Sequence, residues 1–263
     1  GENFNITDYI EKKKIRLTIS NLFDKEQILK DWSSRDQNCE IERSIYLLKK
    51  INDLGKEKIV ISLSHDDAFS NFGGIQKIIR QENADSLLRK DICYVHVCPV
   101  QAVPFSLDHL KITQITTKVT INGKFAGKYL LGSVFNSILK NYQDENLYLF
   151  IHHFYGFKLE AIACFASNIA KKNNAFLWIH DYSSQCYSHT LLRDGMIQCS
   201  SPPPNSVECS FCAYGTNRSQ HLNHMAKLFN INNMKYIVPS EAAKEVLFNS
   251  YLRPKRLENI FVR

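Results

Sequence analysis

Several features that would assign this chain to a common class of protein are missing from its sequence. The 263 residues contain no run of eighteen apolar residues, so we expect no helix that crosses a membrane. The first residues, GENFNITDYIEKKK, hold no apolar core of the kind found in a secretory signal peptide. These two absences favour a cytoplasmic protein.

Three common motifs that bind nucleotides or phosphate groups are missing as well. The sequence has no GxGxxG, so the fingerprint of dinucleotide-binding domains is absent. It has no GxxxxGK[ST], which excludes a P-loop, and no Asp-x-Asp, a motif that holds a metal and a diphosphate. No two glutamates are eight positions apart. Dinucleotide-dependent redox enzymes and P-loop enzymes are therefore disfavoured.

Cysteine is abundant, with eight in the chain, and four of them are clustered. Cys186, Cys199, Cys209 and Cys212 lie within 27 residues, and the last two form a CxxC pair. Without a signal peptide, such a cluster favours a metal over disulfides. The pattern is typical of a structural Zn²⁺ site, and we expect these four thiolates to bind zinc, with His189 as a substitute ligand. The alternative is four unligated thiols or a redox pair.

The formal charge of +7 allows an anionic partner, such as a phosphate group or a membrane surface. A solvated basic face is the simpler interpretation of this moderate excess. The basic residues do not alternate with aromatic residues in one stripe, so we expect no nucleic acid partner. Peripheral contact with the inner face of the membrane remains open.

Two regions of the sequence differ in composition and in the pattern of their apolar residues. Residues 1–57 are charged and helix-prone, which predicts a helical N-terminal extension. From residue 58, continuous apolar strands alternate with amphipathic helices, and an Asn122-Gly123 pair marks a hairpin. Residues 183–218 read as an irregular, cysteine-rich insertion. Over 58–263 we therefore predict an α/β domain with a Rossmann-like, mostly parallel sheet and helices on both faces.

Polar residues follow several of the predicted strands. In parallel sheets of this class, ligands bind outside the carboxyl ends of the strands. The candidate site residues at these ends are His65, Asp66, His152, His153, His180, Asp181, Ser240 and Glu241.

A glycine pair, Gly73-Gly74, separates the first strand from the helix that follows it. Glycine lets the backbone approach a ligand closely, because there is no Cβ in the way. A helix N-terminus offers free N–H groups and a partial positive charge. Together these features suit a phosphate or an anionic sugar, and the alternative is a plain tight turn.

Four stretches together resemble family 4 glycosyltransferases, which have the two-domain GT-B fold. They are SHDDAFSNFGGIQKIIRQE, LFIHHFYGF, LWIHDYSSQCYSHTLLRDGMIQC with the later CSFC, and YIVPSEAAKEVL. The resemblance covers roughly residues 58–263 and corresponds to the N-terminal, acceptor-side half of that fold. The family's C-terminal donor domain carries a pair of glutamates eight positions apart, and no such pair is found here.

The resemblance implies a function and a set of site residues. The family transfers sugars, with retention and largely without metal, from a nucleotide sugar to a glycan or lipid-linked acceptor, as in bacterial polysaccharide synthesis. His180 would then lie near the transferred sugar and donate a hydrogen bond to the leaving group, with Asp181 beside it. Substrate contacts are expected from Gly73, Gly74, His65, Asp66, His152, His153 and Glu241. We expect residues 1–263 alone to be inactive, because the donor domain is missing.

Two other functions fit parts of the sequence. A zinc-stabilised α/β module that binds an anionic partner without catalysis would explain the charge and the cysteines. Another α/β protein, such as an epimerase or a sugar-binding Rossmann protein, would explain the strands and helices.

Overall fold

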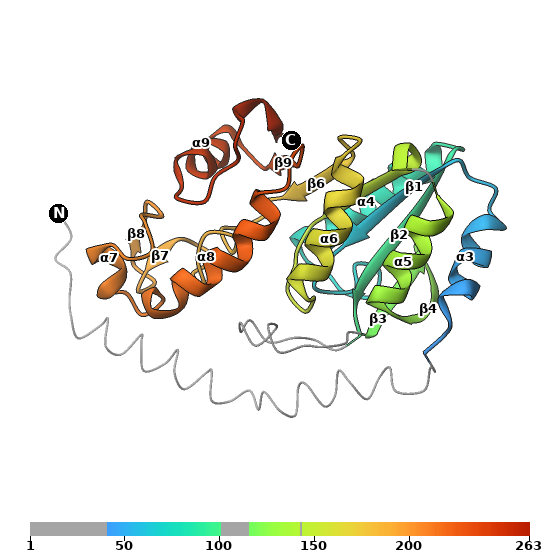
Figure 1. Cartoon of the computed structure of the whole chain (residues 1–263), viewed down its shortest axis with the longest axis horizontal. Coiled ribbons are helices and arrows are strands. Elements are labelled where there is room, and N and C mark those ends of the chain that lie inside the picture. Colours follow the sequence, from blue (N-terminus) through green and yellow to red (C-terminus); the bar gives the residue numbers. More distant parts are fainter. Residues whose placement is uncertain (1–40, 101–115, 143) are drawn as a thin grey trace. The chain divides into compact units, whose positions relative to one another are not determined.

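The computed structural model describes residues 41–100, 116–142 and 144–263. The strands of its main sheet are β1 (Lys58–Leu63), β2 (Ile92–Pro99), β3 (Thr116–Ile121), β4 (Lys124–Leu130), β5 (Leu147–Ile151), β6 (Ala175–Trp178), β9 (Lys235–Val238) and β10 (Ile260–Val262). Their spatial order is β10-β9-β6-β5-β1-β2-β3-β4. Figure 1 shows the sheet with the helices packed around it.

Pairing in this sheet is mostly parallel. Strands β10, β9, β6, β5, β1 and β2 run parallel to their neighbours, and β2-β3-β4 pair antiparallel. The antiparallel part contains the predicted hairpin, with Asn122 and Gly123 both at positive φ, as a two-residue turn of this type requires. The predicted Rossmann-like, mostly parallel sheet is confirmed.

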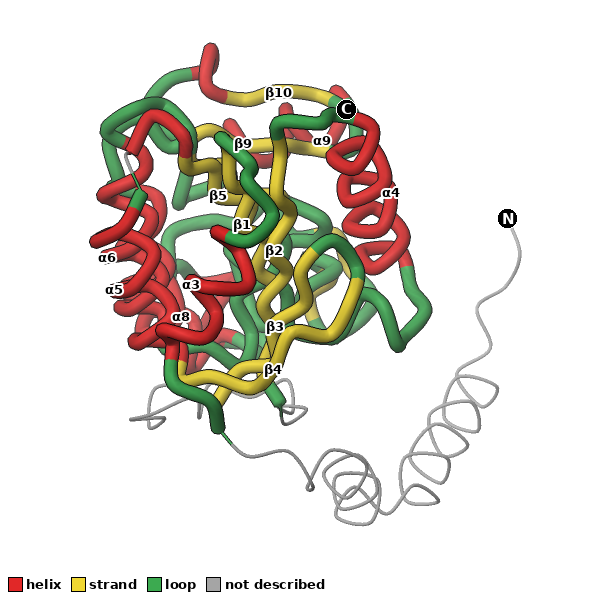
Figure 2. The backbone as a smooth tube through the Cα atoms, turned by 90° about the vertical axis from the view of Figure 1, so that its right-hand side faces the viewer, coloured by secondary structure: helices red, strands yellow, loops and turns green. Residues whose placement is uncertain are grey.

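Helices cover both faces of the sheet. The helices are α3 (Ser44–Asn52), α4 (Gly74–Leu88), α5 (Leu131–Asn141), α6 (Leu159–Ala170), α7 (Val207–Ser210), α8 (Gly215–Phe229) and α9 (Glu241–Asn249), with short 3₁₀ turns η2 (Asp144–Asn146) and η3 (Leu257–Asn259). Helix α4 leads from β1 to β2, whereas α6 and α8 lead in the opposite direction along the sheet. Right-handed crossovers therefore place α4 on the face opposite α6 and α8, as Figure 2 shows.

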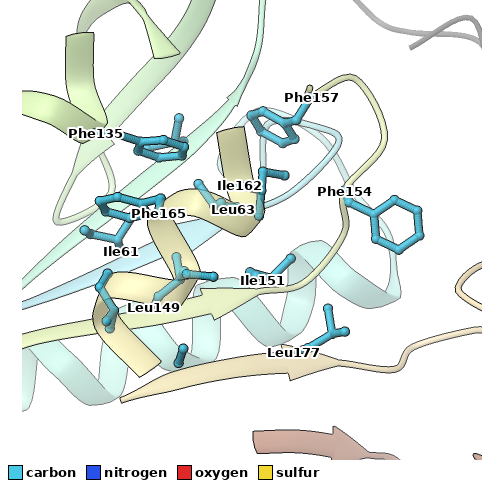
Figure 3. Close-up of a cluster of buried hydrophobic side chains, with 14 of the residues drawn as sticks. Ile61, Leu63, Phe135, Leu149, Ile151, Phe154, Phe157, Ile162, Phe165 and Leu177 are labelled. Carbon is cyan, nitrogen blue, oxygen red and sulfur yellow. The ribbon is translucent and has the colours of Figure 1, made fainter. Parts of the chain in front are cut away.

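The main hydrophobic core lies between the sheet and the layer that contains α5 and α6. Phe135 of α5 and Phe165 of α6 stack with ring centroids 4.0 Å apart. Beneath them lie buried strand residues such as Ile61 and Leu149 (Figure 3). Burial of these side chains contributes most of the stability of such a layer and fixes the strands that carry the site.

The predicted irregular insertion at 183–218 is only partly irregular. It contains the antiparallel pair β7 (Leu192–Arg193) and β8 (Ile197–Gln198), the short helix α7, and the first turn of α8. Of the predicted helical extension at 1–57, residues 1–40 lie outside the described residues. Helix α3 packs on α5 and β4.

The described helices include none that combines the length and the apolar character needed to span a bilayer.

Candidate functional site

The carboxyl ends of β1, β5 and β6 lie at one edge of the sheet. Leu63 at the end of β1 is in register with Ile151 at the end of β5, and Ile151 is in register with Leu177 of β6. The polar residues that follow these strands are therefore neighbours. They separate into two groups, because successive residues of an extended chain point to opposite faces.

The first group, which we call the histidine relay, consists of His180, His152 and Glu82. Nε2 of His180 lies 3.1 Å from Nδ1 of His152. Nε2 of His152 lies 2.9 Å from Oε2 of Glu82, which α4 brings to the sheet. His152 and Glu82 are buried, whereas His180 is partly exposed. The relay thus links a buried carboxylate to an imidazole at the edge of the sheet.

Aromatic rings hold the relay in place. The ring of Trp178 lies nearly parallel to that of His180, with centroids 4.9 Å apart and planes 6° apart. It also stacks on His152, with a centroid distance of 5.5 Å. The guanidinium of Arg263 lies over the same indole, 5.3 Å from the Trp178 ring centroid. Such contacts restrict the rotation of both imidazoles.

Two further groups donate hydrogen bonds to the Glu82 carboxylate. The hydroxyl of Tyr94 donates to Oε2 at 3.0 Å, and Nη1 of Arg263 donates to Oε1 at 3.2 Å. Burial raises the pKa of Tyr94 well above its ordinary value, and the nearby Glu82 raises it further, so the phenol keeps its proton. A cavity of about 330 Å³ adjoins this group and is lined in part by Glu82, Tyr94, Phe150 and Arg263.

The second group consists of His65, His153 and Asp181. The rings of His65 and His153 meet edge to face with centroids 4.7 Å apart. Nε2 of His153 lies 3.6 Å from Oδ2 of Asp181, and Nδ1 of His153 accepts a hydrogen bond from the backbone N–H of Tyr155 at 3.2 Å. The proton of a neutral His153 must therefore be on Nε2, facing Asp181. Asp181 thus partners His153, whereas His180 partners His152.

Burial keeps two of these imidazoles, those of His180 and His65, neutral. It is the main cause that lowers the pKa of His180 to about 3, and neighbouring His152 and His153 lower it further. Burial also lowers the pKa of His65 to about 4. For Asp181, burial alone would raise the pKa, but bonds from His153 and Ser183 more than offset it, and the pKa is about 2. At neutral pH His180 and His65 are therefore uncharged, and Asp181 is ionised.

Gly73 and Gly74 lie at the N-terminus of α4. Gly73 is the residue before the helix, with an extended backbone, and Gly74 is the first helical residue. Both are exposed, and a Cβ on Gly74 would meet no atom within 4 Å. The side chain of Gln76 donates to Asp66 at 3.1 Å, and Asn71 donates to the other oxygen of Asp66 at 2.6 Å. Asp66 therefore braces the loop between β1 and α4.

Ser240 and Glu241 lie after β9 at the start of α9. The Ser240 hydroxyl caps this helix by accepting the N–H of Ala243 at 3.1 Å. The Glu241 side chain is 76% exposed and lies 3.6 Å from Nζ of Lys244. Ser240 thus has a capping role, and Glu241 remains available to a ligand.

The zinc prediction for Cys186, Cys199, Cys209 and Cys212 is wrong. In the part of the chain that the structure describes, no group of three or more His, Cys, Asp or Glu is placed to hold a metal ion. Sγ of Cys209 instead accepts a hydrogen bond at 3.1 Å from Nη1 of Arg218, and this positive guanidinium disfavours a cation on the same sulfur.

The cysteine-containing segment, which is the insertion at 183–218, is held in place by the side chain of Arg218. This residue is 1% exposed and donates to the Ser201 hydroxyl at 2.9 Å and to the carbonyl oxygen of Gln185 at 3.2 Å. These bonds tie both sides of the segment to α8. The alternative metal site of three cysteines and His189 is wrong as well, because no group of three or more possible metal ligands is found among the described residues.

Four residues of the site were not among the predicted ones: Glu82, Tyr94, Trp178 and Arg263. A signal for Glu82 exists in α4, where the buried positions include Gln76, Glu82, Asn83 and Ser86. A helix whose buried face carries so many polar groups must supply them with partners. The identity of those partners depends on the fold.

Comparison of the chain with protein-family models, with curated proteins and with solved structures finds no match.

Proposed function

We propose that this chain forms the acceptor-side domain of a glycosyltransferase, which binds a glycan or lipid-linked acceptor and presents one of its hydroxyl groups to an activated sugar. The observation that supports this proposal best is that stretches far apart in the sequence come together in space. Three of the stretches that resemble family 4 glycosyltransferases, separated by up to about a hundred residues, supply Gly73-Gly74, His152-His153 and His180-Asp181 around the carboxyl ends of neighbouring strands. Ligands of open α/β sheets bind at such an edge.

The proposal gives each part of the edge a task. The open N-terminus of α4 accepts an anionic or hydroxyl-rich group, because Gly74 leaves its space empty. The Asp181 carboxylate and the neutral imidazole of His180 accept hydrogen bonds from sugar hydroxyls. In this proposal the activated sugar is supplied by a second domain, as the family resemblance implies. A net charge of +7 is compatible with acceptors carried at a membrane surface.

Binding of the purified chain to a printed glycan array tests this proposal. We expect a restricted set of glycans to bind the wild type. In His180→Ala the affinity for them should fall by roughly tenfold, which is the cost of about one buried hydrogen bond. The matched control is Glu160→Gln, because Glu160 pairs with Lys227 and lies 3.6 Å from His224. Among the described residues, no hydrogen bond or ion pair joins Glu160 to either of the two groups.

Two results would contradict the proposal. One is a wild-type chain that binds no glycan on the array. The other is a set of bound glycans whose affinity is the same for the wild type and His180→Ala.

A further inference from the structure

The positions of the protons in the histidine relay follow from its fixed end. Glu82 accepts hydrogen bonds from the hydroxyl of Tyr94 and from the guanidinium of Arg263. A guanidinium has donors only, and the Tyr94 hydroxyl donates here. The positive guanidinium of Arg263 favours an ionised Glu82, which has no proton to donate. Nε2 of His152, 2.9 Å away, is then the third donor to this carboxylate.

The proton on Nε2 fixes the rest of the relay. A neutral His152 with its proton on Nε2 has a lone pair on Nδ1. That lone pair faces Nε2 of His180 at 3.1 Å, so His180 must donate its own proton there. Nδ1 of His180 then carries a lone pair. Among the described residues, no hydrogen bond engages this nitrogen, and His180 is partly exposed at the edge of the sheet.

We propose that Glu82, acting through His152, makes His180 a proton acceptor for the hydroxyl group of the bound sugar acceptor, with Nδ1 of His180 as the accepting atom. This inference rests on the proposed function. His180 is the catalytic residue, and His152 and Glu82 are positioning residues. The N–H on Nε2 of His180 is engaged by His152, so it does not serve as a donor to the leaving group, the role that the family resemblance implied.

Bonds and protons balance in the transfer step. The hydroxyl oxygen of the acceptor forms a bond to the anomeric carbon of the activated sugar, and its proton moves to Nδ1 of His180. The bond from the anomeric carbon to the leaving group breaks, and the leaving group takes that electron pair. His180 becomes an imidazolium, a form that burial disfavours in the free chain, where the pKa of His180 is about 3. The Glu82 carboxylate stabilises this charge through His152, as in a Ser-His-Asp triad with one more imidazole. The proton is later released to water.

The experiment is a long-range ¹⁵N–¹H correlation spectrum of the imidazoles in the purified wild-type chain at pH 7.5. This spectrum distinguishes the two neutral tautomers from the charged ring and requires no ligand. We expect His152 and His180 both to be neutral with the proton on Nε2. A proton on Nδ1 of His180, or a doubly protonated His152, would overturn the inference.

The variant Glu82→Gln tests the direction of the relay. In this variant the guanidinium of Arg263 favours the oxygen of the new side-chain amide, so the amide N–H₂ turns toward His152. His152 must then accept on Nε2 and carry its proton on Nδ1, which shifts the proton of His180 to Nδ1 as well. Both tautomers should therefore reverse in Glu82→Gln and stay unchanged in the control Glu160→Gln.

The outcomes separate this inference from the proposed function. Unchanged tautomers in a folded Glu82→Gln would show that Glu82 does not set them, and the inference would fail. If Glu82→Gln does not fold, the wild-type spectrum alone decides. Because neither spectrum needs a glycan, the relay can be contradicted while the proposed function stands. Conversely, a chain with the expected tautomers that binds no glycan would contradict the function.

Discussion

His96 of β2 is a fully buried imidazole that makes the folded state sensitive to acid. Its Nδ1 lies 3.2 Å from the Ser62 hydroxyl, and its ring meets Phe69 edge to face. Burial, with a smaller contribution from nearby His152, lowers its pKa to about 4. In the unfolded chain the pKa is about 6.5. Below pH 6.5 the unfolded chain therefore binds a proton that the folded chain does not bind.

The free energy of unfolding should consequently fall as the pH is lowered from 6.5 to 4. His96 alone accounts for a loss on the order of 2–3 kcal/mol over this range. In His96→Gln the loss should be smaller by about this amount, whatever the stability of the variant at pH 7.5. Urea unfolding at pH 7.5, 6.0, 5.0 and 4.5 measures it, and equal losses in the two proteins would refute the assignment.

A second residue-scale prediction concerns the ion pair between Asp67 and Lys118, which joins the loop after β1 to β3. The two charged atoms are 2.8 Å apart, and the side chains are 10% and 16% exposed. Burial alone would raise the pKa of Asp67, but bonds from Lys118, Ser70 and the N–H of Phe69 lower it overall. The stabilisation is therefore present above about pH 4, the unfolded value, and lost below it.

Asp67→Asn should destabilise the fold by about 2–3 kcal/mol at pH 7, because it removes a carboxylate that pairs with the mostly buried Lys118 ammonium. Adding Lys118→Met to this variant should restore part of the loss. Urea midpoints of the two single variants and the double variant test the coupling. Additive effects would mean that the pair contributes nothing beyond its separate side chains.

The candidate site could be predicted from the sequence only where it depends on local pattern. His152, His153, His180 and Asp181 follow apolar runs, so their place at strand ends is a local property. Which of these side chains contact one another is not a local property. Asp181 faces His153, and His180 faces a relay that ends on Glu82 of α4, 70 residues before its partner His152. That contact depends on which face of the sheet α4 covers.

At the scale of elements, the start of α4 offers a sharp comparison between two adjacent glycines. A Cβ on Gly74 would meet nothing, whereas a Cβ on Gly73 would lie 2.3 Å from Oε1 of Gln76. Neither residue has a φ in the left-handed region. Gly74→Ala should therefore stabilise the protein by about 0.4–1 kcal/mol, since it reduces the entropy of the unfolded chain.

Gly73→Ala should show no such gain, because Gln76 must move and its bond to Asp66 is disturbed. Thermal unfolding of the two variants side by side measures the difference. A destabilised Gly74→Ala would contradict the open space described at this helix start. Gly74→Val fills the same space with a larger side chain, and we expect it to weaken glycan binding much more than it changes stability.

The cysteine-containing segment shows where element prediction fails. The spacing of the cysteines alone predicted a zinc site at Cys186, Cys199, Cys209 and Cys212, because a CxxC pair with two outlying thiols is common in such sites. Nothing in the local pattern indicates that Arg218, one turn into α8, is buried against Cys209. The buried guanidinium of Arg218, with its several hydrogen bonds, supplies the cross-links that a metal was expected to supply.

At the scale of the whole molecule, the class of the sheet was the most predictable property. Alternating apolar strands and amphipathic helices dictate a mostly parallel sheet, and right-handed crossovers then place α4 opposite α6 and α8. The hairpin of β3 and β4 followed from Asn122-Gly123. The proposed function depends on the edge that this topology creates, where residues far apart in the chain meet.

The most direct test of the central claim, that this edge supports sugar transfer, is a rate. The full-length gene product is incubated with a glycan selected on the array and with radiolabelled activated sugars, and label in the glycan is counted. We predict transfer by the wild type and by Glu160→Gln. For His180→Ala we predict a rate at least about a hundredfold lower, as expected for loss of a general base. Absence of transfer by the wild type, or transfer by His180→Ala at the wild-type rate, would contradict the claim.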